Sequence, residues 1–146
     1  MKKCAFTTAI TILCLFVGFG MASAADVFKI GGLVPITGTQ AVMAEDLATG
    51  LKLAEEEVNA AGGVLGMPIK VIIEDTETRP APGMDAARKL IDVDKVTVLT
   101  GGFSSGVSLP IAKLCQSKGI LYVVAVPTSP LFEEVGDFVF MIDVLD

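Results

Sequence analysis

The sequence predicts an α/β fold, a doubly wound parallel sheet with the flavodoxin-like strand order 2-1-3-4-5. Strand-like and helix-like segments alternate along residues 28–142. The strand-like segments are almost continuously apolar, which is typical of strands buried on both faces of a parallel sheet. Right-handed crossovers between such strands place helices on both faces. The 146 residues suffice for one domain of this kind.

Five apolar runs rich in β-branched residues are the predicted strands. They cover residues 28–34, 69–74, 96–99, 120–126 and 138–142. Apolar residues spaced three and four apart predict the helices. These cover residues 41–61, 85–92 and about 106–118, with a short helical turn at 131–135. Residues 79–83 contain two prolines and a glycine, and we expect a loop there.

The first 24 residues predict a secretory signal peptide. Lys2 and Lys3 form a basic start, residues 9–19 are apolar, and residues 22–24 supply the small side chains that a signal peptidase requires. We expect cleavage before Ala25, or else before Asp26. An uncleaved membrane anchor is the alternative, although the apolar run is at the short end for a membrane span.

Composition excludes several classes of function. The net charge is −6, and without the predicted signal peptide nine basic residues stand against 17 acidic ones, a net charge of −8. With no basic run, this balance argues against binding to nucleic acid or to an anionic membrane. The chain has no histidine, which excludes His-based zinc sites and Ser–His or Cys–His catalysis. Cys115 is the one cysteine outside the predicted signal peptide, so we expect no disulfide within the mature chain and a small buried thiol.

The polar loops after three of the predicted strands are the candidate functional site. In an open α/β sheet, ligands bind beyond the carboxyl ends of the strands, where the strand order reverses. Residues 101–106 also begin a helix, whose free N–H groups favour an anion, and the hydroxyls of Ser104 and Ser105 add donors. A small carboxylate would fit there, while plain turn or capping roles are the alternative. The three loops are residues 36–40, 101–106 and 126–130.

Other polar groups are weaker candidates. Glu74, Asp75 and Glu77 could bind a cation or act as acid and base, but a solvated strand end is favoured because nothing nearby completes a site. The acidic run at residues 55–57 is expected to be a solvated helix face. Residues 101–106 lack the Gly-Lys-Ser/Thr of a Walker loop, and the first strand is not followed by a dinucleotide-binding glycine pattern. We therefore predict no catalytic residues, no metal site and no cofactor.

Seven segments together carry a likeness to a known family. They are residues 28–38, 50–63, 66–75, 86–90, 101–106, 119–122 and 127–130. In these segments the chain resembles the periplasmic substrate-binding proteins of branched-chain amino acid ABC transporters, which have the type 1 periplasmic-binding fold. The resemblance implies a leucine-binding domain that is located in the periplasm, binds an amino acid and delivers it to a membrane permease. It implies no enzymatic activity.

The resemblance also implies a set of ligand-binding residues. Ser105 takes the place of the serine that holds the ligand carboxylate, and Thr128 that of the threonine that contacts both polar ends of the amino acid. Val126 takes the place of a residue that contributes a backbone group. Ser104 stands at one of the places of a cysteine pair seen in some members, and Met43 stands where members often have an aromatic residue.

In that family the amino acid lies between two lobes, and residues 25–146 correspond to the first lobe alone. We therefore expect a truncated or partial chain that binds its ligand weakly or not at all. A ligand-sensing module of a receptor and a binding protein for an amide or another small solute are alternatives. An enzyme with Ser105 as nucleophile is a further one, but no His or Lys base is evident beside Ser105 and the Gly-x-Ser-x-Gly turn is missing.

Overall fold

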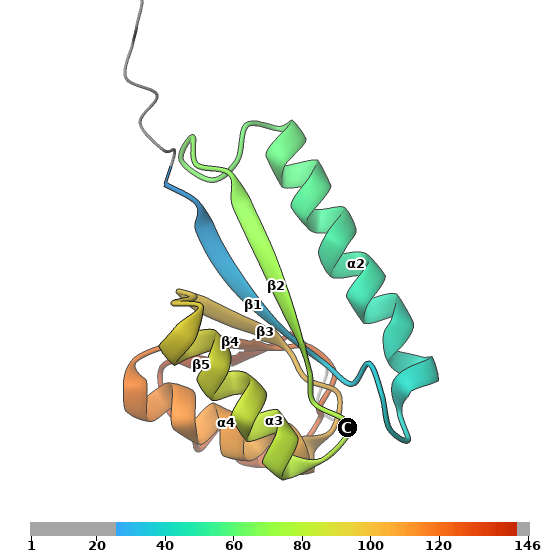
Figure 1. Cartoon of the computed structure of the whole chain (residues 1–146). Helices are drawn as coiled ribbons and strands as arrows, with labels where there is room; N and C mark the ends of the chain where they lie inside the picture. The colour runs from blue at the N-terminus through green and yellow to red at the C-terminus, as the bar shows by residue number, and fades with distance from the viewer. Residues whose placement is uncertain (1–25, 143–146) are drawn as a thin grey trace, which may run out of the picture.

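The computed structural model describes residues 26–142, so the predicted signal peptide lies outside the described residues. A five-stranded parallel sheet has the order β2-β1-β3-β4-β5, which confirms the predicted fold class (Figure 1). The strands are β1 (Phe28–Val34), β2 (Ile69–Asp75), β3 (Val98–Gly101), β4 (Leu121–Val124) and β5 (Val139–Met141). The helices are α2 (Ala41–Ala60), α3 (Pro80–Arg88) and α4 (Ser105–Lys118), with a short π-helix η1 (Lys89–Val93) and a short 3-10 helix η2 (Pro130–Phe132).

The sheet lies between two layers of helix. The helix α2 runs along one face over β1 and β2, and α3 and α4 lie side by side on the other face (Figure 1). The main core fills the space between the sheet and the α3–α4 layer, where Leu33, Leu99, Ile111 and Tyr122 are completely buried. Cys115 belongs to this core, and burial raises the pKa of its thiol to about 12, as expected for an inert thiol. Within residues 26–142, no helix is both long and apolar enough to cross a membrane.

The start of α3 corrects the sequence prediction. The helix begins at Pro80 rather than at residue 85, so the expectation of a loop over residues 79–83 is wrong. Pro80 and Pro82 both lie in the first turn, where the N–H that proline lacks would have no partner inside the helix. Prolines that indicated a loop therefore mark the beginning of a helix.

The third strand begins later than predicted, at Val98 rather than at residue 96. Val96 is buried, but its N–H donates to the carbonyl of Leu90, 3.1 Å away, at the end of the preceding helical segment. The side chain is therefore apolar because it fills the core from a connection, not because it belongs to the strand.

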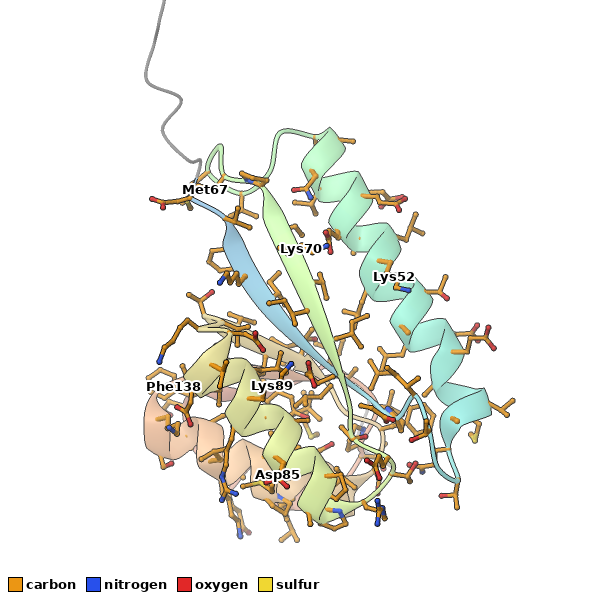
Figure 2. The ribbon with its side chains drawn as sticks, viewed as in Figure 1. Lys52, Met67, Lys70, Asp85, Lys89 and Phe138 are labelled. Carbon is orange, nitrogen blue, oxygen red and sulfur yellow. The ribbon has the colours of Figure 1, made fainter. Side chains whose placement is uncertain are left out.

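Side chains of α2 bind the outer edge of β2. Asn59 donates from Nδ2 to the carbonyl of Ile69 (3.0 Å) and accepts from the N–H of Ile69 at Oδ1 (2.8 Å). Glu55 accepts from the N–H of Val71 at Oε2 (2.8 Å) and pairs with Lys70 at Oε1 (2.9 Å), where β2 runs beside α2 (Figure 2). Burial opposes ionisation, but the hydrogen bonds from Lys70 and Val71 lower the pKa of Glu55. The expectation of a solvated face over residues 55–57 is thus wrong for Glu55.

Candidate functional site

The loop after β3 lies at the centre of the carboxyl edge of the sheet and is bound on both sides. Gly101 is in register with Leu33 of β1 and with Val124 of β4. The N–H of Gly102 donates to the carbonyl of Leu33 (2.8 Å), and the N–H of Ala125 donates to the carbonyl of Gly101 (2.9 Å). These bonds join the loop after β3 to the end of β1 and to the loop after β4.

Two glycines make this close approach possible. Gly101 and Gly102 have φ values of +99° and +85°, a left-handed conformation that favours glycine. A Cβ at Gly101 would clash with the carbonyl of Leu33, and one at Gly102 would lie 2.5 Å from both the Ser108 and the Tyr122 hydroxyl oxygens. The pair of glycines therefore sets the path of the backbone into α4.

The amino end of α4 points to the same edge. Ser104 is the N-cap residue, with extended φ and ψ of −114° and 131°, and its carbonyl accepts from the N–H groups of Val107 (3.1 Å) and Ser108 (2.9 Å). The Ser104 side chain makes no capping hydrogen bond, and Ser105 is the first residue of the helix. A helix terminus leaves its first N–H groups without partners in the helix, which makes it a place for an anion.

The remaining two predicted site residues follow β4. Val126 and Thr128 lie in the connection between β4 and η2, and both are half-buried, as are Ser104 and Ser105. The next residue, Ser129, caps η2 by accepting from the N–H of Leu131 (3.4 Å). The four predicted residues thus stand in two neighbouring loops that the Ala125–Gly101 hydrogen bond joins. Their roles toward a ligand stay predictions.

The third predicted loop, residues 36–40, is hydrogen-bonded to the end of β2. Asp75 accepts from the N–H (3.2 Å) and the hydroxyl (2.6 Å) of Thr37 and from the N–H of Glu77 (2.8 Å). Although burial opposes ionisation, these hydrogen bonds lower the pKa of Asp75. The interpretation of residues 74–77 as a solvated strand end missed this role. The adjacency of the first and second strands in the predicted order, with Thr37 just past the first, was the signal that could have indicated it.

The other acidic groups beside Asp75 are paired. Glu74 binds Lys89, and Glu77 binds Arg79. Within the described part of the chain, no three His, Cys, Asp or Glu side chains gather in an arrangement that could hold a metal ion.

An apolar hollow of about 390 Å³ lies between the end of β1 and the first turns of α2. Met43, in the first turn of α2, is exposed. Apart from Glu45 the lining is uncharged, so the hollow can receive a hydrocarbon group but has no cation for a carboxylate. Its lining residues are Val34, Ile36, Ala41, Val42, Ala44, Glu45 and Ala48.

Comparison with known proteins matches this chain to a protein family. The family described as "Periplasmic binding protein" matches residues 27–145. The Leu/Ile/Val-binding protein homolog 2 of Brucella abortus is 35% identical over 134 residues, which cover 92% of this chain and 35% of that protein. The chain therefore spans about a third of the length of the curated relatives it matches.

Solved structures agree with this result. The leucine-binding protein LivK of Thermotoga maritima superposes with a TM-score of 0.75 and 28% identity, over 81% of this chain and 33% of that one. A solute-binding protein of an ABC transporter from Rhodopseudomonas palustris, in complex with 3,4-dihydroxybenzoic acid, gives a TM-score of 0.75 and 26% identity, over 82% of this chain and 32% of that one. The chain belongs to the periplasmic binding protein family.

Proposed function

We propose that this chain is the first lobe of the substrate-binding component of an ABC transporter for branched-chain or related amino acids. The observation that carries the proposal is the Gly101–Gly102 loop, which is hydrogen-bonded to the end of β1 and to the loop after β4. This loop brings the amino end of α4, with Ser104 and Ser105, beside the loop that holds Val126 and Thr128. The relatives named Leu/Ile/Val-binding and leucine-binding support the class of ligand.

The ligand carboxylate would be held at the amino end of α4. The Ser105 hydroxyl would donate to it, and the N–H groups of the first turn and the helix dipole would favour its negative charge. Thr128 would contact the carboxylate or the ammonium, and Val126 would contribute a backbone group. None of the four predicted site residues carries a charge, so the amino end of α4 is the feature by which this lobe recognises the carboxylate first.

A single lobe leaves the other side of such a ligand in water. The relatives are about three times as long as the segment matched here, and we propose that a second lobe completes the site when it closes over the ligand. The chain by itself then binds weakly. Export by the predicted signal peptide, location in the periplasm and delivery to a membrane permease belong to the same proposal, and the protein acts as a binding protein without catalysis or cofactor.

A second candidate ligand is a small carboxylate that is not an amino acid. The Rhodopseudomonas palustris protein was solved with an aromatic carboxylic acid, and a site that recognises the carboxylate first accepts either class. Isoleucine and 3,4-dihydroxybenzoate are therefore the two probes to compare. Isoleucinol, which has the isoleucine side chain and ammonium but no carboxylate, is the matched negative probe.

The test is an NMR titration of residues 25–146, because chemical shifts detect weak binding. We expect isoleucine to shift the amide signals of Ser105, Gly106 and Thr128, and isoleucinol to leave them in place. Ser105→Ala should lose about 1.5–3 kcal/mol of binding free energy, the range for a hydrogen bond to a charged group, which is roughly tenfold or more in affinity. Equal affinity in Ser105→Ala would remove Ser105 from the site.

The control variant is Ser117→Ala. Ser117 lies at the far end of α4, where its hydroxyl donates to the carbonyl of Leu114 (2.7 Å). It should bind isoleucine like the unmodified chain. If isoleucinol binds as well as isoleucine, carboxylate recognition at the amino end of α4 is wrong.

A further inference from the structure

The loop between β1 and α2 is interlocked with the segment that follows β2. Besides the three hydrogen bonds that Asp75 accepts, the Thr78 hydroxyl donates to the carbonyl of Thr37 (3.4 Å) and accepts from the N–H of Gln40 (3.3 Å). Thr78 thus holds the loop near both ends, since Thr37 lies close to its beginning and Gln40 is the N-cap of α2. We call Thr37, Gln40, Asp75 and Thr78 the loop clamp.

The clamp keeps the backbone in an uncommon conformation. Glu77 and Thr78 have φ values of +50° and +56°, although neither is glycine. A left-handed conformation costs an ordinary residue roughly 1–2 kcal/mol, and it persists only where the surroundings enforce it. Gly38, at φ +92°, lies so close that a Cβ there would clash with the carbonyl of Glu77. The two loops therefore fit together in one specific arrangement.

The clamp decides on which side of β1 the loop lies. Val34, the last residue of β1, has Asp75 of β2 as its register partner on one side. On the other side, Leu33 is in register with Gly101, from which the chain leads to Ser104 and Ser105. A loop leaving β1 could therefore lean either way. The hydrogen bonds of the clamp draw it toward β2, away from the crevice between β1 and β3.

We propose that Asp75 is a positioning residue that holds the β1–α2 loop over β2 and so keeps the amino end of α4 accessible to a ligand. This inference deepens the proposed function, because access matters only if that helix end receives the ligand carboxylate. Asp75 itself acts through Thr37 and Glu77 and does not touch the ligand. Without the Asp75 carboxylate, the loop samples positions nearer to Ser104 and Ser105.

The first arm of the test follows the loop without any ligand. A nitroxide label on Thr39→Cys broadens the amide signals of nearby residues. Cys115 does not compete for the label, because it is buried and burial raises the pKa of its thiol to about 12. We expect clearly stronger broadening at Gly102–Gly106 in Asp75→Ala, which removes all the hydrogen bonds that the carboxylate accepts, than in the otherwise unmodified chain. Thr37→Val, which keeps the backbone bond to Asp75, should give a smaller increase and serves as the second variant.

The second arm is the isoleucine titration of unlabelled Asp75→Ala, where we expect affinity to fall several-fold. The control is Asp92→Ala, which removes a carboxylate paired with Lys118 at the opposite end of α4 and should change neither arm. Unchanged broadening in both Asp75→Ala and Thr37→Val would overturn the proposal. A loop that moves while isoleucine affinity stays the same would overturn the positioning role. If the unmodified chain shows no binding of isoleucine, the proposed function fails, and the labelling arm alone then decides whether Asp75 places the loop.

Discussion

On one face of the sheet, α3 and α4 cover a core in which Leu33, Leu99 and Tyr122 are completely buried, whereas on the other face α2 packs on β1 and β2 (Figure 1). One row of aligned residues crosses the sheet on this second face. Gly32 faces Leu51 of α2, and it is aligned in turn with Thr100, Val123 and Phe140. Phe140, at the far end of that row, is 55% exposed.

The two faces are therefore stabilised in different ways. The α3–α4 face is held by buried apolar side chains, which supply most of the free energy of folding. The α2 face depends more on polar bonds at its rim, through Asn59 and Glu55 on β2 and through the loop clamp. Substitutions on the two faces should therefore change the free energy of unfolding by different amounts, in some cases with opposite sign, and with a different dependence on pH.

The largest expected difference comes from matched leucine truncations. Leu99→Ala removes a completely buried side chain from the α3–α4 core and should lower the free energy of unfolding by about 3–5 kcal/mol, the transfer and cavity cost of such a change. Leu53→Ala on α2, where the side chain is 52% exposed, should change it by less than about 1 kcal/mol. Urea unfolding followed by circular dichroism measures both. Equal losses would mean that the α2 face is as well packed as the other.

Two glycine substitutions should have opposite signs. Gly102→Ala puts a methyl group 2.5 Å from the buried Ser108 and Tyr122 hydroxyls at φ +85°, and overpacking with backbone strain should cost about 2–4 kcal/mol. Gly50→Ala lies within α2, where a Cβ meets nothing within 4 Å, and should stabilise by about 0.5–1 kcal/mol through helix propensity. Thermal unfolding of the two variants checks the prediction. A stabilised Gly102→Ala would show that the loop after β3 is not constrained by those hydroxyls.

The fold was predictable because burial leaves a periodic trace in the sequence. The strand order and β1 agree with expectation, and so does the assignment of Ser104 and Ser105 to the beginning of a helix. Polar bonds made by the backbone leave no such trace. Glu55 and Asp75 are ordinary acidic residues in the sequence. Glu55 has the N–H of Val71 to bind because β2 is an edge strand, and Asp75 has that of Thr37 because β2 lies beside β1.

The sequence prediction was also wrong where the same residue types suit two different local structures. Pro80 and Pro82 are as suitable for the first turn of a helix as for a loop, and an apolar Val96 serves a packed connection as well as a strand. The loop that begins α4 could be predicted from the sequence because its residue types suit few other local structures. Glycine and serine after a buried strand have few alternatives to a turn that begins a helix.

The smallest expected effect is a pH dependence carried by the α2 face. The folded state lowers the pKa of Glu55 through its hydrogen bonds with Lys70 and Val71, against the opposing effect of burial. The ionised carboxylate is therefore the form that the fold binds. Its stabilisation is complete above the pKa of an unfolded glutamate, about 4.3, and is lost as the pH falls through the lower pKa of the folded state. The pKa of Asp75 is lowered as well, so its contribution to stability is also lost as the pH falls.

Glu55→Gln separates this charge effect from packing, because the amide oxygen still accepts from Val71. We expect the variant to be less stable than the unmodified chain at neutral pH, and its free energy of unfolding to fall less steeply between about pH 5 and pH 3, where an unfolded glutamate titrates. Glu56→Gln is the matched control, since Glu56 is the exposed neighbour on the same helix, and its pH profile should run parallel to that of the unmodified chain. Urea unfolding at a series of pH values gives all three profiles. Parallel profiles for Glu55→Gln and Glu56→Gln would show that the Glu55 carboxylate adds no more than an uncharged acceptor, and the attachment of α2 would then rest on Asn59 and apolar contacts.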